Sequence, residues 1–359
     1  MSELELHRRY PRTGSIPRVE LAELPTAVDS VDGLGQKLGI GTLWVKRDDL
    51  TAPRYGGNKV RKLEFLLGHA LAEEHESVWT VGAVGSHHVL ATSLYARQVG
   101  LQPHALHFPQ PVTDHVREVL YALSTTRPHL DLVDSKHALP VELAKYHVRK
   151  WLSRAESPYY IPGGGSSPRG VLGYVNAALE LARQIDNGEL PVPDAIFVAA
   201  GTCGTLAGLQ LGCRLADLPT SIVGVRVVDK VLANPLVTAN LANRAGKILA
   251  DYGVEVPRIR ARDIEIIDDQ IGPGYGEPTS AGREAMRTMD AAAGVELDPT
   301  YTAKAFAGLI DYQKKADRPL RDVLYWHTLS SADLGDLVEE ADVESDLPEE
   351  YQSFFPGKP

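Results

Sequence analysis

Short apolar runs recur along the chain and alternate with stretches in which apolar residues recur every three or four positions. The runs predict strands, because a strand buried on both faces needs a continuous apolar sequence. They lie at 42–47, 78–81, 103–108, 130–133, 195–200, 222–228 and 323–326. The periodic stretches have the i, i+3, i+4, i+7 spacing of a helix with one buried face. They begin at Val60 and continue at 89–99, 112–123, 141–152, 172–184 and 205–215.

The alternation of strands and helices predicts an α/β fold with open, mostly parallel sheets that helices cover on both faces. Residues 10–40 are rich in proline and glycine and predict an irregular lead-in, with one short helix at 31–38. A chain of 359 residues exceeds the size at which one core keeps growing, so we expect two domains. Open parallel sheets bind ligands at the carboxyl ends of their strands, so the loops after the strands are the places to search for chemistry.

Composition and charge narrow the function classes. The chain is 43% hydrophobic and 23% charged, as an ordinary globular protein is. A formal net charge of −10 argues against non-specific binding to nucleic acid or anionic membranes. No run of about 18 apolar residues occurs, and Cys203 and Cys213 have no partners at metal-ligand spacing. We expect a soluble, cytoplasmic protein without a metal, a nucleic-acid partner or a membrane partner.

One loop delivers a lysine to the start of a helix. Gly56 and Gly57 tolerate φ > 0 and let the backbone pass close to a ligand. Lys59 follows them, where unpaired N–H groups and the positive end of the helix dipole disfavour a second positive charge and lower its pKa. An amine that is often unprotonated can condense with an aldehyde. We therefore predict that Lys59 carries pyridoxal phosphate; the alternative is a solvated loop lysine.

Two further strand ends carry candidate residues. The small residues 201–205 stand between an apolar strand and a helix, where backbone N–H groups favour an anion such as a phosphate. A merely tight turn is the alternative there. After the strand at 78–81, Ser86 could act as a nucleophile or hydrogen-bond donor, and His87 or His88 could move protons or cap the next helix.

Tyrosines and a run of acidic residues complete the candidates. Tyr275 stands in the rigid turn 272–278, and Tyr301 follows in the segment 298–304. Either could serve as a general acid or base beside a cation, with ordinary packing as the alternative. Acidic residues are concentrated in the C-terminal stretch 336–350. They predict a solvated terminal face, with a partner-binding tail as the alternative.

Taken together and in order, these segments resemble the fold-type II pyridoxal-phosphate enzymes, whose fold is tryptophan synthase beta-like. They resemble most the 1-aminocyclopropane-1-carboxylate deaminase and D-cysteine desulfhydrase family, from about residue 15 to about residue 335. The matching stretches are 46–51, 56–65, 201–205, 272–276 and 298–302. The resemblance implies a homodimer of chains with a large cofactor-binding domain (1–60 and 172–335), a small inserted α/β domain (61–171) and an acidic tail (336–359).

The resemblance also implies roles for individual residues. Lys59 is the lysine bonded to the cofactor, Lys62 and 201–205 hold its phosphate, and Thr302 lies by the pyridine nitrogen. Ser86 lies beside the substrate, and Tyr275 and Tyr301 face the reacting carbons. The residues implied at the cofactor are Asn58, Lys59, Lys62, His87, Gly201, Thr202, Cys203, Gly204, Thr205 and Thr302.

The chain departs from the family pattern at two places. Where relatives have Gln-Ser-Asn-His, this chain has Gly85-Ser86-His87-His88, so His87 stands in place of an asparagine that would contact the cofactor or the substrate. Near the C-terminus, where the family has His-Thr-Gly-Gly, residues 327–330 of this chain are His-Thr-Leu-Ser. The larger residues add bulk near the substrate end of the cofactor.

The residue at 302 bears on the activity. A carboxylate there would keep the pyridine nitrogen protonated, as opening a cyclopropane demands, whereas a threonine suffices for loss of a good leaving group from Cβ. Thr302 therefore favours β-elimination from a small amino acid, giving a 2-oxo acid and ammonia, as in D-cysteine desulfhydrase. One alternative is 1-aminocyclopropane-1-carboxylate deaminase. Another is a non-catalytic protein that binds pyridoxal phosphate or a partner, suggested by the altered Ser86–His88 segment and the acidic tail.

Overall fold

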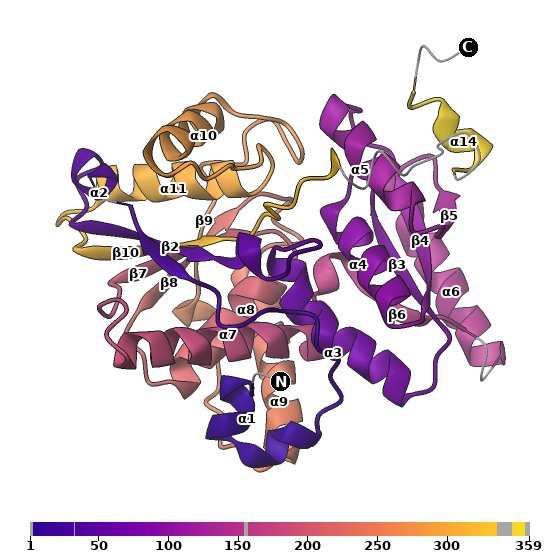
Figure 1. Cartoon of the computed structure of the whole chain (residues 1–359), viewed down its shortest axis with the longest axis horizontal. Coiled ribbons are helices and arrows are strands. Elements are labelled where there is room, and N and C mark those ends of the chain that lie inside the picture. The colour runs from indigo at the N-terminus through magenta and orange to yellow at the C-terminus, as the bar shows by residue number, and fades with distance from the viewer. Residues whose placement is uncertain (1–2, 32, 154–156, 336–346, 356–359) are drawn as a thin grey trace. The chain divides into compact units, whose positions relative to one another are not determined.

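The computed structural model describes residues 3–31, 33–153, 157–335 and 347–355 (Figure 1). The chain divides into two compact units. The first contains Met1–Ile16, Leu21–Phe65 and Ser166–Ala332, and the second contains Pro17–Glu20, Leu66–Gly165 and Asp333–Pro359. The sequence predicted an inserted domain at 61–171, and these limits stay a prediction. Of the predicted acidic tail, 336–346 and 356–359 lie outside the described residues.

The first unit is built on a six-stranded sheet with the order β1-β2-β10-β7-β8-β9. Only β1 runs antiparallel to its neighbour, so the fold class expected from the sequence is confirmed. The carboxyl ends of β2, β10, β7 and β8 therefore lie at one edge of the sheet. The strands are β1 (Val28–Ser30), β2 (Thr42–Arg47), β7 (Ala195–Ala200), β8 (Ser221–Arg226), β9 (Glu265–Ile267) and β10 (Asp322–His327).

Alternate residues of each central strand enter two different cores. On β10, Leu324 and Trp326 join the core beneath α7, α8 and α9, whereas Val323 and Tyr325 join the core beneath α10 and α11. Figure 1 shows α10 and α11 on one face of this sheet and α7 and α8 on the other. Burial on both faces explains why these strands read as unbroken apolar runs. The helices are α1 (Glu5–Arg9), α2 (Leu34–Lys37), α7 (Pro168–Asp186), α8 (Gly204–Leu215), α9 (Pro235–Asp251), α10 (Ser280–Ala293) and α11 (Thr302–Lys315).

The second unit has a four-stranded parallel sheet with the order β5-β4-β3-β6. On one face, Trp79 packs with Leu106 and with Tyr146 of α6. On the other face, the Thr80 hydroxyl lies 2.9 Å from Nε2 of His88 on α4. The elements are β3 (Ser77–Ala83), α4 (His87–Gln98), β4 (Gln102–Phe108), α5 (Asp114–Ser124), β5 (His129–Leu132), α6 (Leu139–Ser153), β6 (Tyr159–Ile161) and α14 (Glu349–Gln352). The division between the units falls inside α3 (Asn58–Ala72).

The C-terminal segment buries a tyrosine in the second unit. Tyr351 of α14 is 0% exposed, and its hydroxyl lies 2.8 Å from Nδ1 of His107 on β4. Nearby, Nε of Arg117 donates to the Phe354 carbonyl at 2.9 Å. Burial lowers the pKa of His107 to about 3. His107 is therefore neutral in the folded protein over the whole physiological pH range.

This buried histidine should make the second unit sensitive to acid. The pKa of His107 is lower in the folded state (about 3) than in the unfolded state, so its contribution is complete above about pH 6.5 and is lost as the pH falls. We expect it to remove about 2 kcal/mol of unfolding free energy between pH 7 and pH 5. Denaturant unfolding at both pH values would measure this in wild type and in His107→Gln, with the exposed His137→Gln as the matched control. The same acid-induced loss in all three proteins would contradict the expectation.

Candidate active site

The loop after β2 places Lys59 on the first turn of α3. The Gly57 N–H donates to the Asp48 carbonyl at 2.8 Å, and the Asn58 N–H donates to the Thr328 carbonyl at 3.2 Å. Gly57 has φ +86°, and a Cβ there would lie 2.9 Å from the Thr328 carbonyl oxygen. The expectation of a left-handed turn at a glycine is confirmed at Gly57, but the close approach is to the backbone of this chain. The loop is thus fixed to the carboxyl ends of β2 and β10.

The Lys59 amine has an altered acidity. Its Nζ donates to Oδ1 of Asn58 at 2.6 Å. Burial of the amine lowers its pKa to about 8, against the opposing effect of the Asp298 carboxylate. The predicted direction of the shift is confirmed, and its main cause is burial. At pH 7 to 8 a substantial part of this amine is unprotonated and nucleophilic.

Asn58 connects the lysine to the loop that follows β7. Its Nδ2 donates to Oγ1 of Thr205 on the first turn of α8, at 3.0 Å. In that loop Cys203 has φ +64°, and the Gly204 N–H donates to Oγ of Ser166 at 3.1 Å. A Cβ at Gly204 would collide with the Ser166 side chain. The first N–H groups of a helix lack partners within it, so this end of α8 favours an anion.

Lys62 brings a second lysine amine to this region. It is 2% exposed, and its Nζ lies 5.8 Å from the centre of the Tyr174 ring. Burial lowers its pKa well below the usual value; the charge of Lys59 lowers it further, and Cys203 opposes the shift. Burial and the neighbouring Lys59 disfavour the charged form of Lys62, and an anion bound beside it would favour that form.

Two tyrosines form a hydrogen-bonded pair in the same unit. The hydroxyl oxygens of Tyr275 and Tyr301 lie 2.6 Å apart. Burial raises the pKa of both, and Asp298 adds to the shift of each. A Cβ at Gly201 would lie 3.5 Å from the Tyr301 ring, so this pair borders the loop that follows β7. Both hydroxyls are therefore protonated and able to donate near neutral pH.

Asp298 fixes the start of α11. Its Oδ1 accepts from the N–H groups of Thr300 (2.9 Å) and Tyr301 (2.7 Å). Its Oδ2 accepts from the Thr302 N–H at 3.0 Å and from the Thr302 hydroxyl at 2.6 Å. The hydroxyl hydrogen of Thr302 is thus directed to a carboxylate. The expected contact of Thr302 with a pyridine nitrogen stays a prediction.

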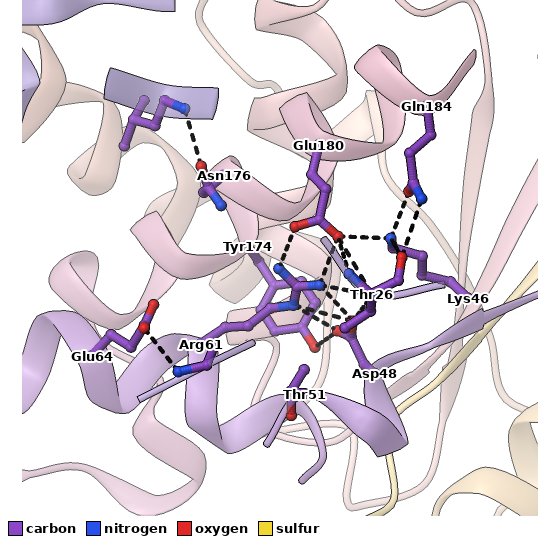
Figure 2. A network of polar contacts seen from close by, with 12 residues as sticks. Thr26, Lys46, Asp48, Thr51, Arg61, Glu64, Tyr174, Asn176, Glu180 and Gln184 are labelled. Carbon is purple, nitrogen blue, oxygen red and sulfur yellow. Dashed lines mark hydrogen bonds and ion pairs between the residues drawn. The ribbon is translucent and has the colours of Figure 1, made fainter. Parts of the chain in front are cut away.

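A network of buried charges joins Arg61, Asp48, Lys46 and Glu180 (Figure 2). Arg61 donates to Oδ1 of Asp48 at 2.7 Å and to Oε2 of Glu180 at 2.9 Å, and Nζ of Lys46 donates to Oε1 of Glu180 at 2.7 Å. Oδ2 of Asp48 also accepts from the Tyr174 hydroxyl at 2.6 Å and from Nε1 of Trp326 at 2.7 Å. Burial opposes ionisation of Glu180, yet Arg61 and Lys46 lower its pKa to about 2. The network ties β2, β10, α3 and α7 together.

The structure joins most of the predicted residues within the first unit. Hydrogen bonds, ring contacts and electrostatic interactions connect Asn58, Lys59, Lys62, 201–205, Tyr275, Tyr301 and Thr302 through Asp298 and each other. Ser86 and His87 belong to the second unit. Ser86 caps α4 by accepting from the Val89 N–H at 3.4 Å, and Nε2 of His87 lies 3.0 Å from Nε2 of His115. Their approach to Lys59 stays a prediction.

Three residues of this region were not identified from the sequence. Ser166 accepts from Gly204 and lies 2.7 Å from Oγ1 of Thr202; the stretch Gly163-Gly164-Gly165 before it was an available signal. Asp298 organises the start of α11, and Glu180 completes the buried network. An acidic residue before a helix and a glutamate on an apolar helix face were the only signals for these two.

Neither a metal cluster nor a spanning helix occurs in the part of the chain that the structure describes. There, no group of three or more His, Cys, Asp and Glu side chains could hold a metal ion. Likewise, none of the described helices has the length and apolar character needed to cross a membrane.

Comparisons with known proteins identify relatives of this chain. A family model described as "Pyridoxal-phosphate dependent enzyme" matches residues 19–328. A D-cysteine desulfhydrase of Salmonella newport (strain SL254) is 36% identical over 320 residues, covering 87% of this chain and 93% of the relative. One of Salmonella paratyphi B is 37% identical over 302 residues, covering 82% and 88%.

Solved structures of similar fold were found as well. The crystal structure of an ACC deaminase homologue has a TM-score of 0.77 at 31% identity and covers 94% of this chain and 99% of its own. A threonine deaminase of Solanum lycopersicum has a TM-score of 0.60 at 16% identity, covering 93% and 88%, and shows likeness of fold alone.

The residues of this chain fit pyridoxal phosphate. The aldehyde requires an amine that is partly unprotonated near neutral pH, and Lys59 supplies one. The phosphate requires positive charge and close backbone approach, and Lys62 and the loop at Gly204, where a Cβ would collide with Ser166, supply both.

Proposed function

The chain belongs to the pyridoxal-phosphate-dependent enzymes of fold type II, and from this premise we propose that it eliminates the Cβ substituent of a small D-amino acid, with D-cysteine as the substrate. It is a lyase that uses pyridoxal phosphate. The proposed reaction converts D-cysteine and one water molecule into pyruvate, hydrogen sulfide and ammonia. The proposal depends most on one observation, the Lys59 amine held by Asn58, which is itself bonded to Thr205.

Lys59 has two tasks in this proposal. Its amine holds the cofactor aldehyde, while Lys62 and residues 201–205 hold the phosphate. When bound, the cofactor withdraws electrons from the Cα of an amino acid attached to it, which acidifies the Cα–H bond. With a substrate bound in the site, Lys59 Nζ would be the base that removes the Cα proton. A pKa of about 8 suits a base that works near neutral pH.

The tyrosine pair supplies the proton that the leaving sulfur receives. The leaving sulfur departs more readily when it is protonated, and hydroxyl groups of raised pKa keep a proton to give. Because the two hydroxyls are 2.6 Å apart, Tyr301 can replace the proton that Tyr275 gives up. The roles of Ser86 and His87 at the substrate, which the family resemblance implies, stay a prediction.

A substrate panel tests the function. We expect the purified enzyme loaded with pyridoxal phosphate to release pyruvate and sulfide from D-cysteine, and pyruvate from β-chloro-D-alanine. Release of 2-oxobutanoate from 1-aminocyclopropane-1-carboxylate in preference would support the deaminase alternative, which the likeness to an ACC deaminase homologue suggests. A loaded protein that turns over neither these compounds nor L-cysteine and D-serine would contradict the proposal and support the non-catalytic alternative.

We expect the rate of cofactor capture to report the pKa of Lys59. Only the unprotonated amine condenses with an aldehyde, so a pKa of about 8 predicts that capture by the apo-protein rises roughly tenfold from pH 7 to pH 9 and then levels off. Stopped-flow absorbance after addition of pyridoxal phosphate measures this rate. A rate that is still rising steeply at pH 10 would instead indicate an ordinary lysine.

The proposal includes a homodimer in the cytoplasm. Light scattering after size-exclusion chromatography would measure twice the mass of the 39.0 kDa chain. A single-chain mass for the active, loaded protein would contradict the homodimer.

A further inference from the structure

The turn that carries Tyr275 was expected to be rigid, but the described structure shows little within the turn to hold it in place. Gly272 has φ +65° and Gly276 has φ +79°, and Gly272 and Pro273 are exposed. The backbone hydrogen bond within the turn, from the Glu277 N–H to the Gly274 carbonyl, is long at 3.4 Å. Glycines lose more conformational entropy on ordering than other residues. A turn of this composition needs an external contact to keep one conformation.

Lys304 of α11 makes that contact. Its Nζ donates to the Ile271 carbonyl at 2.8 Å and to the Gly274 carbonyl at 3.2 Å. The two carbonyls belong to the first and the fourth residue of the turn 271–276, so the ammonium group links its beginning to its middle. The side chain of Lys304 is 0% exposed. α11 also carries Asp311, whose carboxylate accepts from the side chain of Gln270, immediately before the turn.

Burying an ammonium group is unfavourable unless its donors are satisfied. A methionine of similar length would fill the same space without that penalty. The acidic side chains that act on Lys304 electrostatically are Glu277 and Asp298, whereas its hydrogen bonds go to the two backbone carbonyls. The role specific to a lysine at this position is thus to donate to the turn.

We propose that Lys304 is a positioning residue. It clamps the turn 271–276 so that the Tyr275 hydroxyl stays hydrogen-bonded to the Tyr301 hydroxyl. One helix then fixes both members of the pair. Tyr301 immediately precedes α11, with its N–H on Asp298, and Tyr275 is held through the lysine two residues into the helix. The kinetic consequence rests on the proposed function, because it requires Tyr275 to give a proton; the clamp itself does not.

Hydrogen exchange of the loaded enzyme tests the clamp without reference to activity. In Lys304→Met we expect the amides of 272–277 to exchange at least about tenfold faster than in wild type, with the rest of α11 unchanged. Lys247→Met, the same change at an exposed lysine of α9, is the matched control and should leave the turn unaffected. Unchanged exchange at 272–277 in Lys304→Met would overturn the proposal.

Kinetics separate the clamp from the role of Tyr275. We expect Tyr275→Phe to lower kcat for D-cysteine about 100-fold and Lys304→Met to lower it about tenfold. The double variant should be no slower than Tyr275→Phe, because the clamp acts through that hydroxyl. A double variant in which the two losses multiply would assign Lys304 a general structural role and overturn the positioning role. Full activity in Tyr275→Phe would contradict the proposed function instead, and the exchange result would still decide the clamp.

Discussion

Lys59→Ala is expected to lower turnover by a factor on the order of 1,000 or more and to remove the visible absorption band of cofactor bonded to lysine. The expectation follows from the two tasks of one amine, which holds the cofactor aldehyde and moves the Cα proton. A 2.6 Å hydrogen bond to Asn58 positions the amine for both tasks, and a pKa of about 8 leaves part of it unprotonated near neutral pH. Steady-state kinetics and an absorption spectrum of the purified variant measure both effects.

The matched control for this variant is Lys247→Ala, at an exposed position of α9. It should keep the band and wild-type turnover. Circular dichroism of Lys59→Ala should match wild type, because the hydrogen bonds of the buried charge network do not involve Lys59. An undiminished band in Lys59→Ala would assign the cofactor to another lysine.

Asp48→Ala is expected to destabilise the protein by about 3–5 kcal/mol. The change removes one of the two carboxylates that pair with the buried Arg61 guanidinium, at 2.7 Å in the wild type, and leaves Glu180 alone to balance Arg61 and Lys46. It also removes the acceptor of the Tyr174 hydroxyl and of Trp326 Nε1. Breaking one side of a buried ion pair costs much more than the pair contributes, because the remaining charge stays out of water. Denaturant unfolding of the loaded enzyme measures the loss.

Asp29→Ala provides the comparison. Asp29 also pairs with an arginine, Arg47, at 2.9 Å, but its side chain is 49% exposed. Exposed pairs contribute about 0–1 kcal/mol, so this variant should be close to wild type. If Asp48→Ala were no less stable than Asp29→Ala, the buried network in Figure 2 would contribute no more to stability than an exposed ion pair.

The central strands and most helices could be predicted because burial imprints a pattern on them. β7 and β10 alternate between two cores and so read as unbroken apolar runs. β1, β6 and β9 were missed because three residues carry no usable period. The helices α9, α10 and α11 were missed as well. Only Gly282, Ala285 and Met289 are buried in α10. Its sequence shows too narrow an apolar stripe to be read.

The site was predictable where a residue's chemistry depends on its own loop, and less so where it depends on distant residues. Lys59 could be found from the glycines before it and the helix after it. The cause of its pKa could not, since burial depends on elements that lie far along the sequence. The same holds for Asp298, whose importance arises from folding against Lys59, Tyr275 and Tyr301. Ser166 reaches Gly204 only because α7 and α8 begin side by side.

The most direct test is to identify the lysine that bears the cofactor. Reduction of the loaded enzyme with borohydride fixes pyridoxal phosphate to the amine that holds it, and peptide mass spectrometry then locates the label. We predict a single labelled site at Lys59, in the segment Gly56-Gly57-Asn58-Lys59. Label at Lys62 or at any other lysine, or no label on a protein that turns over D-cysteine, would contradict the account.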